Sequence, residues 1–230
     1  MLKLVSLDEF TIHSFLDSIK SECNHTIPIL DQVALGMEII VAMPSEMVLA
    51  HAPASVLETR GNVFAHQFLE GVRFMHQQHV AHLDLKPDNL LITATARLMI
   101  IDFSISVRVI KEEDWIQGYR GTEGWVAPEV NATKYQPIRA DLWSAGKVLQ
   151  YLACHQHTGV IETLANNLLR RDPQHRPLLS KIDLPCQEVL GLKRKLGVEE
   201  GEKEGIKRKC SGSGVIPQNA LAIPASLPTP

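Results

Sequence analysis

Apolar residues at the start of the chain fall in short runs separated by turn-forming residues. The runs predict three β-strands, at Met1–Val5, Ile29–Val33 and Met37–Met43. Gly36 marks the turn between the last two runs. Over Leu7–Ile19 the apolar residues recur at helical spacing, and Glu9 lies on the same face as Ile12 and Leu16. The first 43 residues therefore predict a small sheet with one helix, whose apolar face includes a carboxylate.

A helical period dominates the later part of the chain. Phe64, Phe68, Val72 and Met75 share one helix face, which predicts an amphipathic helix over Val63–His76, after a connector at 44–60. The remaining pattern predicts a hairpin with strands at 90–92 and 98–101, a connector at 102–129, and helices at 140–153 and 161–169. The expected fold class is α+β, with a strand-rich front part and a mainly helical back part.

Composition and charge are those of an ordinary globular protein, with 45% hydrophobic and 21% charged residues among 230. The net charge of −3 argues against general nucleic-acid binding. No apolar run reaches the ~18 residues that a membrane span requires, and the first residues do not resemble a signal peptide. The four cysteines are far apart and show no metal-binding spacing. They predict reduced thiols in an intracellular protein.

The composition changes beyond about residue 190, where charges cluster and a Pro/Ala-rich stretch follows. Residues 193–209 contain seven Lys/Arg and four Glu. This composition predicts a disordered tail at 186–230. The basic triplets at 193–195 and 207–209 resemble a bipartite nuclear signal, and a solvated charged tail is the alternative. The expected location is intracellular: the cytoplasm, with the nucleus as a second compartment.

The most polar short stretch in an apolar context is residues 82–90, which read HLDLKPDNL. It carries a carboxylate (Asp84), an ammonium (Lys86) and an amide (Asn89) between apolar neighbours. A short loop that holds fixed charges between apolar anchors is typical of a positioned site. A second carboxylate, Asp102, directly follows the apolar run 98–101. We expect the fold to bring Asp84, Asn89 and Asp102 together.

Several motifs of the chain resemble those of protein kinases, in the same order along the sequence. They are the catalytic loop HRDLxxxN at 82–90, the metal-binding DFG at Asp102-Phe103-Ser104, the APE at Ala127-Pro128-Glu129, the loop-supporting helix at Asp141 and the late arginine at Arg176. The resemblance covers about residues 1–180. The segment RGTEGWVAPE is similar to that of short fungal protein kinase-domain proteins. In the family, the late arginine pairs with the APE glutamate, which is Glu129 here.

The resemblance implies a bilobal fold that transfers the γ-phosphoryl group of ATP to Ser/Thr hydroxyls of protein substrates. It implies Asp84 as the catalytic base and Lys86 as the cation near the transferred group. Asn89 and Asp102 would hold Mg²⁺, because their oxygens are the hard ligands that this ion prefers. Lys3, with Glu9 as its partner, resembles the strand lysine that binds the ATP phosphates. ATP and a protein substrate are therefore the implied partners, without nucleic acid or membrane, and the oligomeric state is not indicated.

The chain departs from the kinase pattern at its front end and in two motifs. It contains no GxGxxG loop, and two residues precede Lys3. Leu83 replaces the arginine that binds the activation-segment phosphate, so phosphorylation of 102–129 is not expected to switch activity. Ser104 replaces a glycine, and positive φ would cost serine more.

These features predict a partial, truncated N-lobe at 1–43, a hinge at 44–46, a C-lobe at 47–185 and the tail. ATP is expected between the lobes, near residues 42–45. The intact polar set at 84–102 favours an active kinase. The missing glycine-rich loop leaves two alternatives, a pseudokinase that serves as a nucleotide-binding or scaffold module, and an incomplete gene product.

Overall fold

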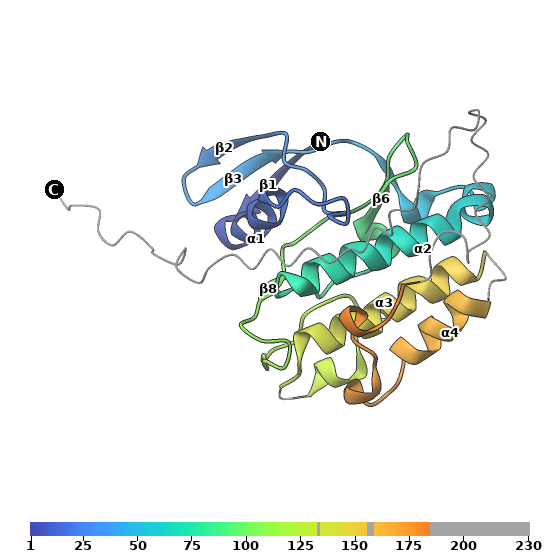
Figure 1. The fold of residues 1–230 in the computed structure, drawn as a ribbon. Coiled ribbons are helices and arrows are strands. Elements are labelled where there is room, and N and C mark those ends of the chain that lie inside the picture. The colour runs from blue at the N-terminus through green and yellow to red at the C-terminus, as the bar shows by residue number, and fades with distance from the viewer. Residues whose placement is uncertain (133, 156–158, 185–230) are drawn as a thin grey trace, which may run out of the picture. The chain divides into compact units, whose positions relative to one another are not determined.

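The computed structural model describes residues 1–132, 134–155 and 159–184, which form helices and small antiparallel sheets (Figure 1). Contacts divide the chain into Met1–Lys195 and Leu196–Pro230, and the described residues belong to the first unit. The tail predicted at 186–230, with its basic triplets, lies outside the described residues. None of the described helices combines the length and the apolar character needed to cross a membrane.

The elements alternate at first and become mainly helical later. In chain order they are β1 (Leu2–Ser6), α1 (Leu7–Ser18), β2 (Asp31–Leu35), β3 (Glu38–Ala42), β4 (Met47–Val48), η1 (Leu49–His51), α2 (Ala54–Gln77), β5 (Val80–Ala81), η2 (Pro87–Asn89), β6 (Leu90–Ile92), β7 (Leu98–Ile100), β8 (Val107–Arg108), η3 (Pro128–Asn131), α3 (Pro137–Ala153), α4 (Gly159–Leu168), η4 (Pro173–His175) and η5 (Leu179–Lys181). The sequence predicted all three long strands of the front part, and most helix ends within three residues. The α+β class is confirmed.

The front sheet has the strand order β1-β3-β2, with both pairs antiparallel. Gly36 has a φ of +63° in the tight turn between β2 and β3, a conformation that glycine adopts at little cost. Lys3 lies opposite Val41 in the register, so its side chain projects from the same face as the buried Val5. At the end of β1, the hydroxyl of Ser6 accepts a hydrogen bond from the Glu9 amide at 3.2 Å and caps α1.

The start of α2 corrects the prediction of a connector over 44–60 and a helix from Val63. The helix begins at Ala54, directly after Pro53. Leu57 and Gly61 are buried, so the inward face extends two turns further than the aromatic pattern indicated. The intervening Glu, Thr and Arg at 58–60 are exposed, and they concealed the helical period in the sequence. The short pairings of β4 with β6 and of β5 with β8 were also not predicted.

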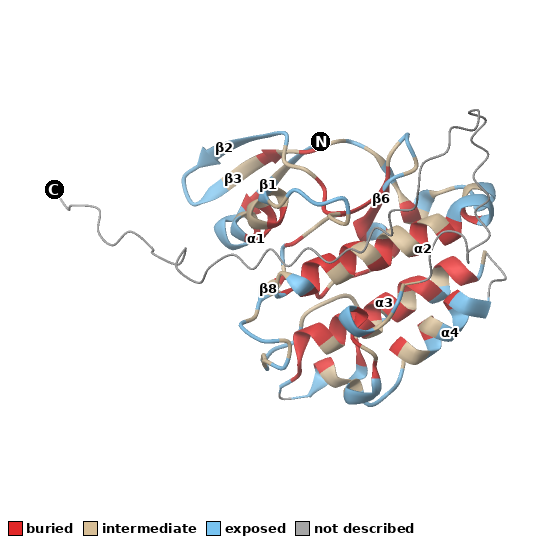
Figure 2. Cartoon of the chain, viewed as in Figure 1, coloured by how far each residue is buried: buried red, intermediate tan, exposed pale blue. Residues whose placement is uncertain are grey.

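The main core lies between α2 and α3, which run side by side and are buried along most of their lengths (Figures 1 and 2). It includes large buried side chains from several elements: Leu16, Phe64, Phe68, Met75, Leu85, Phe103, Tyr135 and Leu149. A smaller cluster sits under the front sheet and contains Val5, Ile27, Val41, Met43, Leu91 and Met99. Strand β2, by contrast, is exposed at every position. The helical part therefore provides the rigid base on which the polar loop 82–89 is built.

Candidate active site

The backbone of the polar loop is anchored on one buried carboxylate of α3. Asp141 is 0% exposed, and its Oδ2 and Oδ1 accept hydrogen bonds from the amides of His82 and Leu83 at 2.6 and 2.7 Å. Oδ2 also lies 3.1 Å from Nε2 of the buried His76 on α2. A buried carboxylate that accepts several hydrogen bonds holds its donors in one geometry. Asp141 therefore fixes the start of the loop, as the sequence predicted, whereas the contribution of His76 was not anticipated.

Leu83 joins this loop to the segment that follows Asp102. It is buried and adopts a φ of +68°, which is uncommon for a residue other than glycine. Gly121 has a φ of +116°, and an added Cβ there would lie 2.7 Å from the Leu83 carbonyl oxygen. Only glycine allows this close approach of the two backbones. The approach places the next residue, Thr122, over the polar side chains of the loop.

The side chains of the loop form one hydrogen-bonded group around Asp84. Its Oδ1 accepts from the Thr122 hydroxyl at 2.6 Å, and its Oδ2 accepts from Lys86 Nζ and Asn89 Nδ2, each at 2.8 Å. Lys86 Nζ also donates to the Thr122 hydroxyl at 2.6 Å. The structure thus brings Asp84, Lys86 and Asn89 together, with Thr122 in contact with both Asp84 and Lys86. A carboxylate held this way presents a basic oxygen at a defined position.

Lys3 bridges two carboxylates, of which the sequence associated only Glu9 with it. Its Nζ lies 2.5 Å from Glu9 Oε1 and 2.8 Å from Asp102 Oδ1. Burial alone would lower the pKa of Lys3, but the hydrogen bonds and charges of Asp102 and Glu9 outweigh it and raise that pKa. Burial would likewise raise the pKa of Asp102, and Lys3 reverses this and lowers it. Both groups are therefore charged at neutral pH. The two ion pairs connect β1, α1 and the segment that follows β7.

The backbone conformation of the 102–104 segment differs from the expectation of strain at Ser104. Among the described non-glycine residues, positive φ occurs at Asp102, at +68°, and at three other positions that do not include Ser104. The unusual conformation is therefore at the carboxylate itself, and serine fits its position without that cost. The amide of Ser104 lies 3.4 Å from Asp102 Oδ1.

A cluster of rings around Phe103, the residue after Asp102, was missed in the sequence. Phe103 lies between His13 and His82, with ring centroids at 5.0 and 5.3 Å. His13 Nε2 lies 2.6 Å from the Ile27 carbonyl oxygen, and burial lowers the pKa of His13. The usable signal was its position four residues after Glu9, which places both on one face of α1. The stack couples α1 to the segment that carries Asp102.

A buried ion pair holds the end of the segment 102–129. Arg176 is 1% exposed and binds Glu129 with both terminal nitrogens, with Nη2 at 2.8 Å from Oε2. This confirms the predicted partner of Glu129. The guanidinium also lies over the Trp143 ring at 5.1 Å. The bidentate geometry fixes the orientation of Glu129. The pair lies far along the chain from the polar loop and serves to hold the segment.

Oxygen donors for a metal ion are present at Asn89 and Asp102. Asn89 donates through Nδ2 to Asp84, which turns its amide oxygen the other way. The Ile101 amide donates to the Asn89 carbonyl at 3.0 Å, so Asp102 follows directly beside Asn89. An amide and a carboxylate fit Mg²⁺, which takes few protein ligands when phosphates supply others. In the described part of the chain, no three His, Cys, Asp or Glu side chains are arranged to hold a metal without such a ligand.

Comparison with known families agrees with this geometry. The sequence pattern described as "Protein kinase domain" matches residues 12–160, which is more than half of the chain. The chain belongs to the protein kinase domain family. The matched region contains Asp84, Lys86, Asn89, Asp102 and Glu129, and it begins after Lys3 and Glu9.

Individual relatives of this kinase-family chain are protein kinases of several organisms. The chain is 42% identical over 106 residues to serine/threonine-protein kinase 17A of Oryctolagus cuniculus, covering 44% of this chain and 25% of that protein. It is 35% identical over 116 residues to CBL-interacting protein kinase 16 of Oryza sativa subsp. japonica, covering 49% and 25%. The match to serine/threonine-protein kinase ULK3 of Xenopus laevis is 37% over 89 residues, covering 38% and 19%. The chain therefore spans about a quarter of the length of these relatives, or less.

Proposed function

We propose that this chain carries the catalytic residues of an ATP- and Mg²⁺-dependent protein kinase that acts on Ser/Thr hydroxyls. The observation that carries the proposal is the single hydrogen-bonded group of Asp84, Lys86, Asn89 and Thr122, which lies beside Asp102. Phosphoryl transfer requires mainly positioning of the reactants and neutralisation of charge, and these residue types supply both. Membership of the protein kinase family supports the assignment.

Asp84 acts as the base for the substrate hydroxyl. Its Oδ1 and Oδ2 each accept hydrogen bonds, and a hydroxyl that replaced Thr122 as donor would meet an oriented acceptor. Lys86, at 2.8 Å from Asp84, carries positive charge to the place where the phosphoryl group would be transferred. Both side chains are partly accessible, at 12% and 18% exposure. This combination allows the hydroxyl to approach while the loop stays rigid.

Lys3, Asn89 and Asp102 would bind the nucleotide from the other side. Mg²⁺, when bound, offsets phosphate charge and orients the transferred group. Lys3 is held by Glu9 and Asp102 in a partly exposed position, from which its ammonium can reach a phosphate oxygen. Asp102 and Asn89 offer oxygens at the end of β7 and beside the polar loop. The proposed roles of these three residues thus follow from their charge and position.

The proposed substrates are Ser/Thr hydroxyls of proteins. Two of the relatives described above are named serine/threonine-protein kinases. In this family, a lysine two residues after the catalytic aspartate marks the Ser/Thr-directed branch, and Lys86 stands at that position. α4 follows α3 with few residues between them, so we infer that substrates are recognised mainly through the segment 102–129. The predicted intracellular location stays a prediction.

The experiment that tests the proposal is phosphate transfer from radiolabelled Mg·ATP to two peptide pools, one with Ser/Thr acceptors and one with Tyr acceptors. We expect transfer to the Ser/Thr pool, and a loss of about 10²–10⁴-fold in Asp84→Asn, because a positioned base contributes that much. Asp102→Ala should also abolish transfer. Asp88→Asn is the matched control, since this neighbouring carboxylate is exposed. Equal transfer by wild type and Asp84→Asn would contradict the assignment.

A pseudokinase is the second candidate, and the absence of a GxGxxG motif from the 230 residues is the observation that favours it. Thermal stabilisation by Mg·ATP separates the two candidates, because a ligand that binds only the folded state raises the unfolding temperature. Stabilisation of wild type but not of Asp102→Ala, without transfer to either peptide pool, would assign a nucleotide-binding module. No stabilisation at millimolar Mg·ATP would exclude an active kinase and a nucleotide-binding module, and would leave a scaffold module for this chain.

A further inference from the structure

We propose that two copies of this chain associate through strand β1, which pairs antiparallel with β1 of the second copy. The two three-stranded sheets then form one continuous sheet of six strands, related by a twofold axis beside Leu4. The contact consists of backbone hydrogen bonds along Leu2–Ser6 and of the apolar side chains of Leu2 and Leu4. β1, which carries Lys3, becomes an interior strand. The proposal concerns the front sheet and does not rest on kinase activity.

β1 is an edge strand in the described part of the chain, because the order of the front sheet is β1-β3-β2 (Figure 1). The amide of Met43 donates to the Met1 carbonyl at 2.8 Å, and the Met1 amino group donates to the Met43 carbonyl at 2.7 Å. In an antiparallel ladder, such doubly bonded pairs alternate with pairs that make no bond to each other. The backbone groups of Lys3 therefore also face β3, whereas the N–H and C=O groups of Leu2 and Leu4 point to the free edge. A further strand can bond to them there.

The sequence of β1 does little to protect this free edge. Proteins commonly guard an edge strand with proline, a bulge or an outward charge. β1 reads LKLVS, contains no proline, and pairs with β3 in a register without a bulge. Its one charge, Lys3, projects to the inner face, where Glu9 and Asp102 bind it. The opposite edge is better guarded, because β2 follows Pro28 and begins with Asp31.

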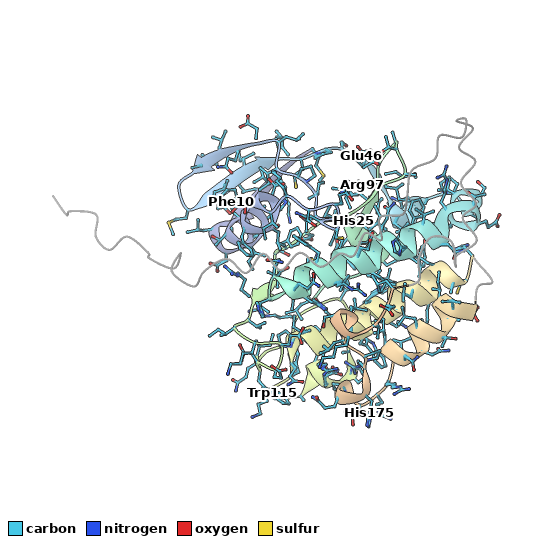
Figure 3. The ribbon with its side chains drawn as sticks, viewed as in Figure 1. Phe10, His25, Glu46, Arg97, Trp115 and His175 are labelled. Carbon is cyan, nitrogen blue, oxygen red and sulfur yellow. The ribbon has the colours of Figure 1, made fainter. Side chains whose placement is uncertain are left out.

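The outer face of the front sheet carries exposed apolar side chains. By the register, Leu4, Ile40 and Val33 form one row across the three strands, with Leu2 in the next row on the same face. Leu2 is 74% exposed, Leu4 49% and Val33 60%. Contiguous exposed apolar surface is typical of a site of association. The inner face is already covered, since Phe10 of α1, labelled in Figure 3, packs against the small core under the sheet.

The occupant that this edge fits is a second copy of β1. In antiparallel self-pairing centred on Leu4, this residue faces its own copy, and the outward N–H and C=O groups of each bond the other. Leu2 then lies opposite Ser6 of the second copy on the outer face. Lys3 lies opposite Val5 of the second copy on the inner face, so each ammonium stays with its own carboxylates and meets no like charge. A twofold contact is the commonest arrangement of homo-oligomers.

Two copies could also stack their outer faces, but the charges on this face disfavour that arrangement. Asp31 and Glu38 are exposed and lie on the same face as the apolar rows, opposite Ala42 and Ser6 in the register. Stacking would remove these carboxylates of both copies from water, without a basic partner among the described residues of that face. Edge pairing leaves both carboxylates hydrated, so it is the arrangement that we propose.

Two measurements on the full chain test the pairing. Sedimentation equilibrium from micromolar to millimolar concentration should show a reversible equilibrium between monomer and dimer. Hydrogen exchange should show that protection of the Leu4 amide rises at least tenfold from the monomer to the dimer. The Lys3 amide, which faces β3 in both states, should change much less. This contrast between neighbouring amides is specific to pairing along the edge of β1.

Leu4→Pro is the variant that separates pairing from folding. The Leu4 N–H points to the free edge, so proline removes no bond within the sheet but blocks the centre of the contact. We expect a folded monomer at concentrations at which wild type is dimeric. Val33→Lys is the control, because it changes the same outer face on a strand outside the contact, and it should remain dimeric. If Leu4→Pro fails to fold, Leu4→Lys serves instead, since it places like charges opposite each other.

Three outcomes would overturn the proposal. The first is a chain that stays monomeric up to millimolar concentration. The second is a dimer whose Leu4 amide exchanges as fast as in the monomer, because the copies would then associate through another face. The third is association of Leu4→Lys that equals that of wild type, or a dimer that Val33→Lys abolishes and Leu4→Lys does not.

Discussion

The two halves of the candidate site are held by different means. The loop with Asp84, Lys86 and Asn89 stands on Asp141, which is 0% exposed, and on the large core around α2 and α3 (Figure 2). Lys3 lies on β1, at one side of a three-stranded sheet with a small core, and pairs with Asp102, at 31% and 34% exposure. The loop is therefore set by burial, whereas Lys3 is held by one buried carboxylate, Glu9, and one partly exposed carboxylate, Asp102.

This difference shows that the polar loop needs rigidity more than Lys3 does. Buried hydrogen bonds leave no water to replace a lost partner, so they hold one geometry. Exposed ion pairs contribute little to stability and exchange partners readily. A loop that orients a base benefits from the first kind. In the proposed function, Lys3 exchanges a carboxylate for a phosphate, and its pair with Asp102 suits this role because water and salt weaken the carboxylate's hold on it.

The largest loss of stability is expected at Asp141, the buried anchor of the polar loop. Asp141→Ala leaves the amides of His82 and Leu83 buried without an acceptor. We expect a loss of roughly 3–5 kcal/mol in the free energy of unfolding, or failure to fold. Urea unfolding followed by circular dichroism measures it. The exposed Asp183→Ala is the control. A loss below ~1 kcal/mol for Asp141→Ala would contradict the role of Asp141 as the rigid anchor of the loop.

The next effect concerns the close approach of Gly121 to Leu83. Gly121→Ala and Gly118→Ala share the cost of positive φ, but only at Gly121 would the new Cβ meet neighbouring atoms. We expect Gly118→Ala to lose ~1–2 kcal/mol, and Gly121→Ala to lose about 1–3 kcal/mol more. Thermal unfolding of the pair measures the difference. Equal losses in the two variants would show that the segment moves away at little cost.

A smaller loss of stability is expected at Lys3. Lys3→Met removes the partly exposed pair with Asp102 and leaves the Glu9 carboxylate, which is 5% exposed, without its charged partner, so the free energy of unfolding should fall by about 1–3 kcal/mol. It should nevertheless abolish the thermal stabilisation by Mg·ATP that wild type is expected to show. Lys20→Met, at an exposed lysine just after α1, is the control for the loss of a positive charge. A loss as large as that of Asp141→Ala would mean that Lys3 belongs to the rigid half.

A weaker effect, dependent on pH, is expected at the stack of His13 on Phe103. Burial lowers the pKa of His13, so the unfolded chain binds the proton first as the pH falls. The stabilisation is therefore complete above the ordinary histidine pKa of about 6.5 and declines as the pH falls below it. In His13→Leu, the free energy of unfolding should vary less between pH 7 and pH 5. His51→Leu, at an exposed position, should keep the slope of wild type.

No effect is expected from dephosphorylation. Leu83 is buried at the position where other kinases bind the phosphate of this segment, and it offers no charge to one. Phosphatase-treated and untreated protein should therefore transfer phosphate at equal rates in the assay described above. A large drop after treatment would show that the loop needs a phosphate in addition to its buried anchor.

Much of the fold was predictable because periodicity reports which face of an element is buried. The strands of the front part and the later helices were found this way, and the order of polar motifs indicated the site. The start of α2 was missed because exposed polar residues interrupt its period at 58–60. The pairings of β4 and β5 were missed because two residues carry no period. His76 and His13 were missed because their roles depend on partners far along the chain, Asp141 and Phe103.

The sequence by itself determined the family, the polar residues of the loop and the partner of Arg176, because these depend on residue types in a fixed order. The tertiary structure alone decided that the strain lies at Asp102 and not at Ser104, and that Lys3 bridges Glu9 and Asp102. It also decided that His25 faces Glu70 inside the molecule. These features arise where separate elements meet. No local pattern specifies such meetings, because the distance between two side chains depends on the packing of the whole core.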